Sequence, residues 1–259
     1  MLIVDSCDVM FMQNWEHVEF ILENINRIPK RPHEYTDFSR IKEWYLNGWA
    51  KHYRQTMFFS AYLNVDLLNM WNKQCTNYHA KFKLRGEYTE GSISQVIPKI
   101  KQIFYRIKCD KLSEADDARF NYFVDEHLDR LRKSTLRHIL VFVPSYFDYV
   151  RLRNHFKKHD VNFTKMSEYS SRGASKKARR EFFAGEFQFI LYTERVHFFY
   201  RNSIRGVENI VFYGLPQNAH FYPELLNLLQ DGQAGSCAAL FTKYDQFELE
   251  RVVGSDRTA

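Results

Sequence analysis

The pattern of apolar and polar residues becomes regular after residue 138. Short apolar runs there alternate with segments in which apolar residues recur every three or four positions, the repeat of an amphipathic helix. Apolar strands that alternate with helices predict an α/β fold in which a parallel sheet is covered on both faces. The predicted strands are 139–143, 162–166, 187–193, 209–213 and 238–241, and the predicted helices are 146–158, 175–184, a short one ending at Tyr200, 221–230 and one from Lys243.

The first 65 residues repeat this pattern on a smaller scale. Leu2–Val4 reads as a buried strand that ends on carboxylates, 18–28 as an amphipathic helix, and Thr56–Ala61 as a second apolar strand. Because parallel central strands need neighbours on both sides, residues 1–65 are expected to be the C-terminal half of a lobe whose first part is missing from this chain.

Residues 66–137 have a different pattern. The alternation in Lys81–Arg85 and the run Ile97–Lys108 predict strands, and Ser113 is expected to cap a helix with apolar residues as far as Leu131. The chain is therefore predicted to hold an incomplete lobe (1–65), a connecting region with its own structure (66–137) and a second, intact lobe (138–259).

Composition narrows the class of protein. The 259 residues are 45% hydrophobic and 17% aromatic, enough for one large core or two modest ones, and the net charge of +6 favours a polyanionic partner. The four cysteines lie far apart, which predicts neither a disulfide framework nor a zinc knuckle, although the spacing of Cys75 and His79 would suit two metal ligands. No apolar run is long enough to cross a bilayer, so no membrane partner is expected.

Basic residues gather where a nucleic acid could bind. In a parallel sheet the loops at the strand C-termini meet at one edge, here Pro144–Ser145, Ser167–Ser171 and Thr193–Arg195. Free amides at the start of the predicted helix 175–184 could accept phosphate oxygens, with cations nearby to add charge, although a solvated basic face and an ordinary turn are the alternatives. The candidate RNA-binding residues are Tyr169, Arg172, Lys176, Lys177, Arg179, Arg180, Thr193, Arg205 and Gly206.

The stretch from Phe187 to Pro216 resembles the second RecA-like lobe of a superfamily 2 helicase. Asp5-Ser6-Cys7-Asp8 then stands where a DEAD-box helicase places Asp-Glu-Ala-Asp, with Ser6 replacing the acid that orients water. The sequence contains no Gly-x-x-x-x-Gly-Lys-Ser/Thr loop to cradle phosphates. Residues 217–227, where paired arginines would follow Leu-Pro, contain neither lysine nor arginine. We therefore expect no ATP hydrolysis and no cofactor.

Longer phrases resemble one family, the U3 small nucleolar RNA-associated protein 25 family. They lie at 8–18, 143–154, 167–171, 191–195, 204–207 and 212–216. The resemblance implies a nucleolar, helicase-like protein of the small-subunit processome that has lost catalysis and acts in early pre-ribosomal RNA processing. It implies U3 small nucleolar RNA or pre-ribosomal RNA, and processome proteins, as partners.

Two other functions stay open at this point. The full-length protein could be an ATP-dependent RNA helicase that uses a phosphate loop outside this chain. Alternatively, the chain could be a protein-interaction module whose basic character is incidental.

Overall fold

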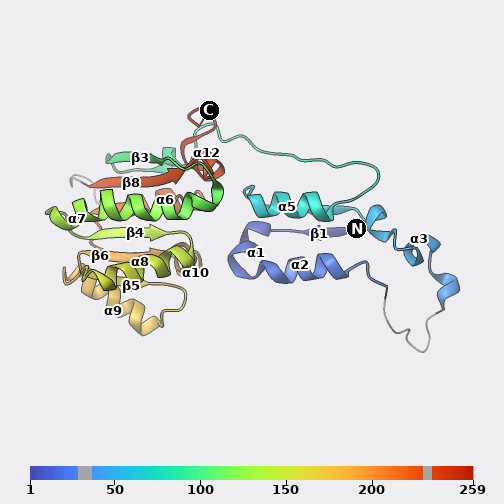
Figure 1. The fold of residues 1–259 in the computed structure, drawn as a ribbon, viewed down its shortest axis with the longest axis horizontal. Coiled ribbons are helices and arrows are strands. Elements are labelled where there is room, and N and C mark those ends of the chain that lie inside the picture. The colour runs from blue at the N-terminus through green and yellow to red at the C-terminus, as the bar shows by residue number, and fades with distance from the viewer. Residues whose placement is uncertain (29–36, 230–234, 259) are drawn as a thin grey trace. The chain divides into compact units, whose positions relative to one another are not determined.

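The computed structural model describes residues 1–28, 37–229 and 235–258. The chain forms two compact units, Met1–Gly86 and Glu87–Ala259. Each unit has its own parallel sheet, and the fold class predicted from the sequence, α/β with RecA-like parallel-sheet lobes, is confirmed (Figure 1).

The first unit is built on a small parallel sheet. Strand β1 (Leu2–Val4) pairs with β2 (Thr56–Phe58), so both predicted strands form, each over three residues. Val4 and Cys7 pack with Leu67 in a small buried cluster. The remaining elements are α1 (Cys7–Gln13), α2 (Trp15–Asn24), η1 (Phe38–Arg40), α3 (Glu43–Leu46), α4 (Ala50–Tyr53) and α5 (Val65–Gln74).

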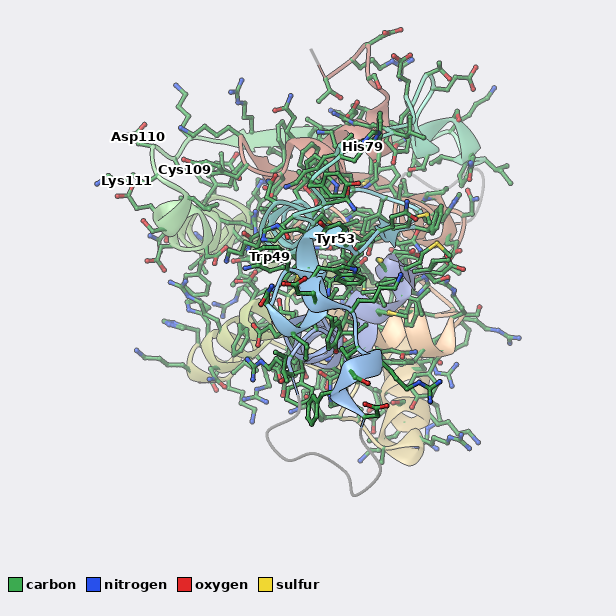
Figure 2. All side chains as sticks on the ribbon, turned by 90° about the vertical axis from the view of Figure 1, so that its right-hand side faces the viewer. Trp49, Tyr53, His79, Cys109, Asp110 and Lys111 are labelled. Carbon is green, nitrogen blue, oxygen red and sulfur yellow. The ribbon has the colours of Figure 1, made fainter. Side chains whose placement is uncertain are left out.

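Aromatic contacts link the later segments of the first unit. Tyr53 lies with its ring centroid 4.9 Å from that of Trp44 and 5.3 Å from that of Tyr78. Trp49 precedes α4 and keeps 54% of its surface exposed, and Figure 2 labels it beside Tyr53. Surface rings therefore supply part of the packing in a unit whose buried cluster is small.

The second unit contains a six-stranded parallel sheet in the order β3-β8-β7-β4-β6-β5. Its strands are β3 (Lys101–Ile107), β4 (Ile139–Val143), β5 (Phe163–Met166), β6 (Phe189–Thr193), β7 (Asn209–Phe212) and β8 (Ser236–Thr242). Its later helices are α8 (Tyr146–Lys158), α9 (Arg172–Phe183), α10 (Glu194–Tyr200), α11 (Phe221–Leu226) and α12 (Gln246–Val253).

Alternation along the strands divides the core of this unit into two layers. Leu140 and Phe142 of β4 face the layer that contains α9, α10 and α11. Ile139, Val141 and Val143 face the opposite layer, which contains α8. Because all five residues of β4 are buried, both faces of the central sheet are covered, as its continuous apolar sequence requires.

One helical run differs from the expectation for 113–131. A 3₁₀ turn, η3 (Leu112–Glu114), leads into α6 (Ala115–Tyr122), a π-helical stretch, η4 (Phe123–Leu128), and α7 (Asp129–Lys133). Ser113 lies inside the 3₁₀ turn and is not the cap that the sequence suggested. Phe123 and Leu128 are fully buried against β4 and α8, so this run belongs to the core of the second unit.

Other predicted elements changed in extent. Lys81–Arg85 has no regular secondary structure, because it has no partner strand, and Phe82 and Leu84 are 81% and 98% exposed. Another 3₁₀ turn, η2 (Ser92–Gln95), precedes β3, which is shorter than the predicted strand 97–108. The predicted helix 221–230 ends at Leu226, and residue 230 lies outside the described residues.

The compact second unit begins well before residue 138. β3 pairs with β8 along seven residues. The apolar pattern of residues 97–108 predicts a strand but does not identify its partner. Residues 87–137, predicted to be part of a connecting region, thus share a sheet and a core with 138–258. Within the described ranges, no helix is both long enough and apolar enough to span a membrane.

Candidate nucleic-acid interface

Four turns of the second unit meet at the edge where its parallel strands end. They follow β5, β6, β4 and β7, which are neighbours in that order in the sheet. The hydroxyl of Thr193 donates to Oε2 of Glu168 at 2.9 Å, which joins the turns after β6 and β5. This edge therefore brings the predicted loops at 144–145, 167–171 and 193–195 together.

Thr193 itself points into the protein. It is 1% exposed, and its Oγ1 also accepts the backbone N–H of Val196, which caps α10. Both interactions of the hydroxyl are internal. Thr193 therefore holds the turns after β5 and β6 in place. Its predicted contact with RNA stays a prediction, and its hydroxyl is already engaged by Glu168 and Val196.

Glu194, which the sequence analysis did not single out, is buried at the same edge. Its Oε1 and Oε2 accept the backbone N–H groups of Asn218 and Gln217 at 3.1 and 3.2 Å. Burial raises the pKa of Glu194 to about 8, against the two backbone hydrogen bonds and the charge of Arg251, which lower it. The carboxyl group thereby fixes the segment after Pro216, where the sequence lacks the expected arginines.

Arg119 is a second buried group that sequence reasoning missed. Its Nη2 donates to Oδ2 of Asp245 at 2.7 Å, and its Nη1 lies 4.0 Å from Oδ2 of Asp148. Burial raises the pKa of Asp148 to about 6, and the charge of Arg119 opposes that rise. Since its charge is matched by internal carboxylates, Arg119 ties α6 to α8 and to the turn after β8.

The N-terminus of α9 presents a different arrangement. Ser171 caps the helix by accepting the N–H of Ala174 at 3.2 Å, and the helix begins at Arg172, three residues before the predicted start. The first turn of α9 contains no acidic residue, whereas α8 and α10 carry Asp148 and Glu194 there. The positive end of the helix dipole is therefore not offset by a carboxylate of its own first turn.

The cations of α9 do not all face the same way. Arg172, Lys176, Lys177 and Arg180 are exposed, and Lys177 lies 3.6 Å from Glu181. Arg179 is only partly exposed, and its Nε is buried without a hydrogen-bond partner among the described residues. Its charge lowers the pKa of Tyr192, which burial raises to about 12, so Arg179 lies toward the sheet. The predicted basic surface is thus reduced to four exposed cations.

Aromatic side chains lie beside this helix start. Tyr169 is 72% exposed, as expected, and its ring centroid lies 4.9 Å from that of Tyr146. Phe147, at the start of α8, is 85% exposed and was not predicted as a site residue. Its position in the first turn of α8 could not have signalled this, because Asp148 in the same turn is buried. Exposed rings near cations suit base stacking.

Arg205 and Gly206 lie at the opposite ends of the strands, in the turn just before β7 begins. Gly206 contacts Phe183 at the C-terminal end of α9, and Glu208 donates its backbone N–H to His138, just before β4 begins. Gly206 has φ +80°, and a Cβ there would come within 2.9 Å of Phe183 Cδ2. The structure explains this glycine by packing, and it does not bring Arg205 to the edge that holds Tyr169 and Arg172.

The turn after β1 contains the degenerate motif. Asp5 accepts the N–H of Ser6 at 2.7 Å, and Asp8 accepts the N–H of Ala61 at 3.1 Å. Cys7 is buried, which raises the pKa of its thiol to about 11. The polar groups of 5–8 thus stabilise the turns that follow β1 and β2.

Metal binding finds little support in the geometry. Cys75 is buried, whereas His79, labelled in Figure 2, is exposed. Across the described residues, no group of three or more His, Cys, Asp or Glu side chains could hold a metal ion.

Two family models together match most of the chain. "Utp25, C-terminal domain" matches residues 92–259, and "UTP25, NTP hydrolase-like domain" matches residues 1–82. The boundary between the two matches agrees with the division of the structure after Gly86.

Relatives from animals, plants and fungi align with nearly the whole chain. The human "U3 small nucleolar RNA-associated protein 25 homolog" is 42% identical over 264 residues, covering 100% of this chain and 35% of its own length. "Protein NUCLEOLAR FACTOR 1" of Arabidopsis thaliana is 35% identical, covering 98% of this chain and 34% of its own length. The "U3 small nucleolar RNA-associated protein 25" of Schizosaccharomyces pombe is 39% identical and covers 99% and 40%. The chain spans about a third of the length of these curated relatives.

Solved structures of DEAD-box proteins are similar at low identity. Saccharomyces cerevisiae Dbp5 bound to RNA and ADP BeF3 matches with a TM-score of 0.49 and 15% identity, covering 96% of this chain and 55% of that chain. Escherichia coli SrmB, bound to the regulator RraA, matches with a TM-score of 0.48 and 19% identity, covering 60% and 85%.

Proposed function

The chain belongs to the Utp25 family, and from that premise we propose that it acts as a non-catalytic, helicase-like scaffold that binds RNA during early pre-ribosomal RNA processing. The RNA would be U3 small nucleolar RNA or pre-ribosomal RNA, and the protein partners would be components of the small-subunit processome. The work of the whole protein would take place in the nucleolus and serve 40S subunit biogenesis.

The names of the relatives support this setting. Several are named for association with U3 small nucleolar RNA, and the Arabidopsis relative is named as a nucleolar factor. Because the chain covers about a third of the length of those proteins, the partners and the location of their full-length forms are proposals for this chain.

The N-terminus of α9 is the observation that carries RNA binding. Arg172 and Lys176 are exposed, the first turn has no acid, and the exposed ring of Tyr169 precedes the helix. Amides and cations at a helix start bind phosphate oxygens, and an exposed ring offers a surface for a base. The phosphates of an RNA strand would bind the amides and cations, and one of its bases would stack on the ring of Tyr169.

Three features support the loss of catalysis. Ser6 supplies a neutral hydroxyl where a carboxylate would orient water. Asp8 is engaged by Ala61, and Glu194 holds the segment after Pro216 in which no arginine is present. The residues of this chain therefore offer little to position a water molecule or to stabilise charge on a phosphoryl group.

Neutralising α9 tests the proposed RNA contact. In the variant R172Q/K176Q/R180Q, the affinity for single-stranded RNA should fall about tenfold or more, and the slope of log K against log salt should flatten by about 2 for three lost contacts. The control K101Q/R106Q/K108Q removes three exposed cations from β3 and the residue after it, at the far edge of the same sheet. Equal losses in both variants, or none in the α9 variant, would refute binding at α9.

A second candidate is an ATP-dependent RNA helicase in full-length form. The match of residues 1–82 to an NTP hydrolase-like domain is the observation in its favour. An ATPase assay on the full-length protein with RNA separates the two functions. Turnover that Asp5→Ala abolishes would establish the helicase and overturn the scaffold, whereas the scaffold predicts no turnover above the background of the variant.

A further inference from the structure

A cluster of three cations lies on the other side of β5 from α9. Arg153 and Lys157 are four residues apart in α8, so they lie on the same side of that helix. Lys165 is the third residue of β5, which is an edge strand of the six-stranded sheet. None of the three belongs to the candidate interface described above.

Packing between α8 and β5 brings these side chains together. Residues two apart in a strand face the same side, so Lys165 shares the face of Phe163. The ring of Phe163 lies 5.2 Å from that of Phe156 in α8, between Arg153 and Lys157 in sequence. Partial burial lowers the pKa of Lys165, and the charges of Lys157 and Arg153 lower it further, as expected for three neighbouring cations.

Within the described ranges, no carboxylate forms an ion pair with the cluster. Among the described residues, Arg153, Lys157 and Lys165 form no ion pair, and the guanidinium of Arg153 donates only to the amide oxygen of Asn154. The opposite side of α8 is different, because Arg151 lies over the ring of Phe120 and pairs with Asp117 at 2.6 Å. The charge of Arg151 on one side of α8 is thus neutralised by a carboxylate, whereas the cations on the side toward β5 are not paired with a carboxylate among the described residues.

We propose that Arg153, Lys157 and Lys165 form a second phosphate-binding site, which holds an RNA strand that continues from the start of α9 around the β5 edge. The proposal rests on the proposed function, since it assumes that α9 binds RNA. Figure 1 shows β5 at one end of the sheet, with α8 and α9 beside it, and the two core layers place these helices on opposite faces. The RNA strand would pass over β5, the edge strand of the sheet, from α9 on one face to α8 on the other.

RNA suits this surface better than an acidic peptide does. The aromatic residues Phe147 and Tyr169 lie at the start of α8 and in the turn after β5, on the elements that carry the two groups of cations. An RNA strand offers a phosphate at every nucleotide and bases that stack on such rings, whereas an acidic peptide offers charge alone.

The variant R153Q/K157Q/K165Q tests the second site in the 259-residue chain. With a single-stranded RNA of about 20 nucleotides, it should lose about tenfold in affinity and flatten the salt slope by about 2. With a dinucleotide, whose single bridging phosphate can occupy only one site at a time, its affinity should stay within about twofold of that of the native chain. The K101Q/R106Q/K108Q variant serves as the control for charge, and thermal unfolding confirms that each variant is folded.

The two proposals fail in different ways. If the α9 variant loses binding but R153Q/K157Q/K165Q retains the native slope on the long RNA, the second site is refuted and the proposed function stands. If the native chain binds neither RNA, both are refuted. Displacement of the long RNA by polyglutamate of equal charge as readily as by unlabelled RNA would also refute the second site, because it would show a surface selective only for negative charge.

Discussion

Helices α9 and α10 start at the same edge of one sheet, from the neighbouring strands β5 and β6, and both have a hydroxyl cap. α10 places Glu194 in its first turn, and that carboxyl group is buried and bonded to the segment after β7. α9 has no acid in its first turn and exposes Arg172 and Lys176. A buried carboxyl group in the first turn commits the start of α10 to internal contacts, whereas a first turn without an acid leaves the start of α9 available to an external anion.

The largest expected effect is on the pH dependence of stability, through the buried carboxyl group of Glu194 in α10. Burial raises the pKa of Glu194 from 4.5 to about 8, so between these pH values the native state holds a proton that the unfolded state has released. The contribution of this group to stability is therefore greatest below pH 4.5 and declines as the pH rises to about 8. Glu194→Gln should remove that decline, which can reach about 1.4 kcal/mol per pH unit.

Urea unfolding of the native chain and of the Glu194→Gln variant between pH 5 and pH 8 measures this difference. The neighbouring charges of Arg251 and Glu248 remain in both proteins. Glu186→Gln, which removes an exposed carboxylate, is the control for net charge. Curves that stay parallel across this range for the native chain and Glu194→Gln would show that Glu194 does not hold its proton.

The next effect concerns Gly206, which contacts Phe183 at the C-terminal end of α9. Gly206→Ala should destabilise the chain by about 1–3 kcal/mol, because residue 206 has a φ of +80°, whereas the exposed ring of Phe183 can move away from the added Cβ. Gly173→Ala in α9 is the matched control, since nothing lies within 4 Å of its added Cβ. Chemical denaturation gives the stabilities, and RNA affinity is measured on the folded protein. Weaker RNA binding by folded Gly206→Ala would return Arg205 and Gly206 to the interface.

The smallest effect comes from giving α9 the acid that α10 has. Ala174→Glu would complete a capping box with Ser171, whose hydroxyl already accepts the N–H of residue 174. The variant should gain about 0.3–1 kcal/mol of stability and lose a few-fold in RNA affinity, because its carboxylate competes with phosphate for the helix start. Ala184→Glu adds the same charge at the other end of α9 and should leave RNA affinity unchanged. A stabilised Ala174→Glu variant with native RNA affinity would show that the lack of an acid in the first turn of α9 does not contribute to RNA binding.

Local patterns predicted most elements of the second unit. The α8 helix has the predicted bounds, and β4 does too, because their apolar positions repeat with a clear helical or strand period. Pairing between distant segments was not predictable in this way. β3 has its partner more than a hundred residues later, and nothing in residues 97–108 specifies β8.

The candidate site was predicted only in part for the same reason. Tyr169 follows a predicted strand closely, so its place at the ends of the strands could be inferred from neighbouring residues. The Ser171 cap, which puts Arg172 in the first turn of α9, was not predicted. The inward orientation of Glu194 depends on the backbone of Gln217 and Asn218, which a sequence places more than twenty residues away. Gly206 was predicted as an RNA-binding residue, and its contact with Phe183 of the same chain was not predictable from the sequence around it.

Mapping the residues that crosslink to RNA shows whether the strand lies at the start of α9. Ultraviolet irradiation of the chain with single-stranded pre-ribosomal RNA, followed by peptide mapping, should place the main crosslink on Tyr169 or elsewhere in residues 167–180. Crosslinks confined to residues 201–208 or to the first unit, with none in 167–180, would contradict binding at the start of α9.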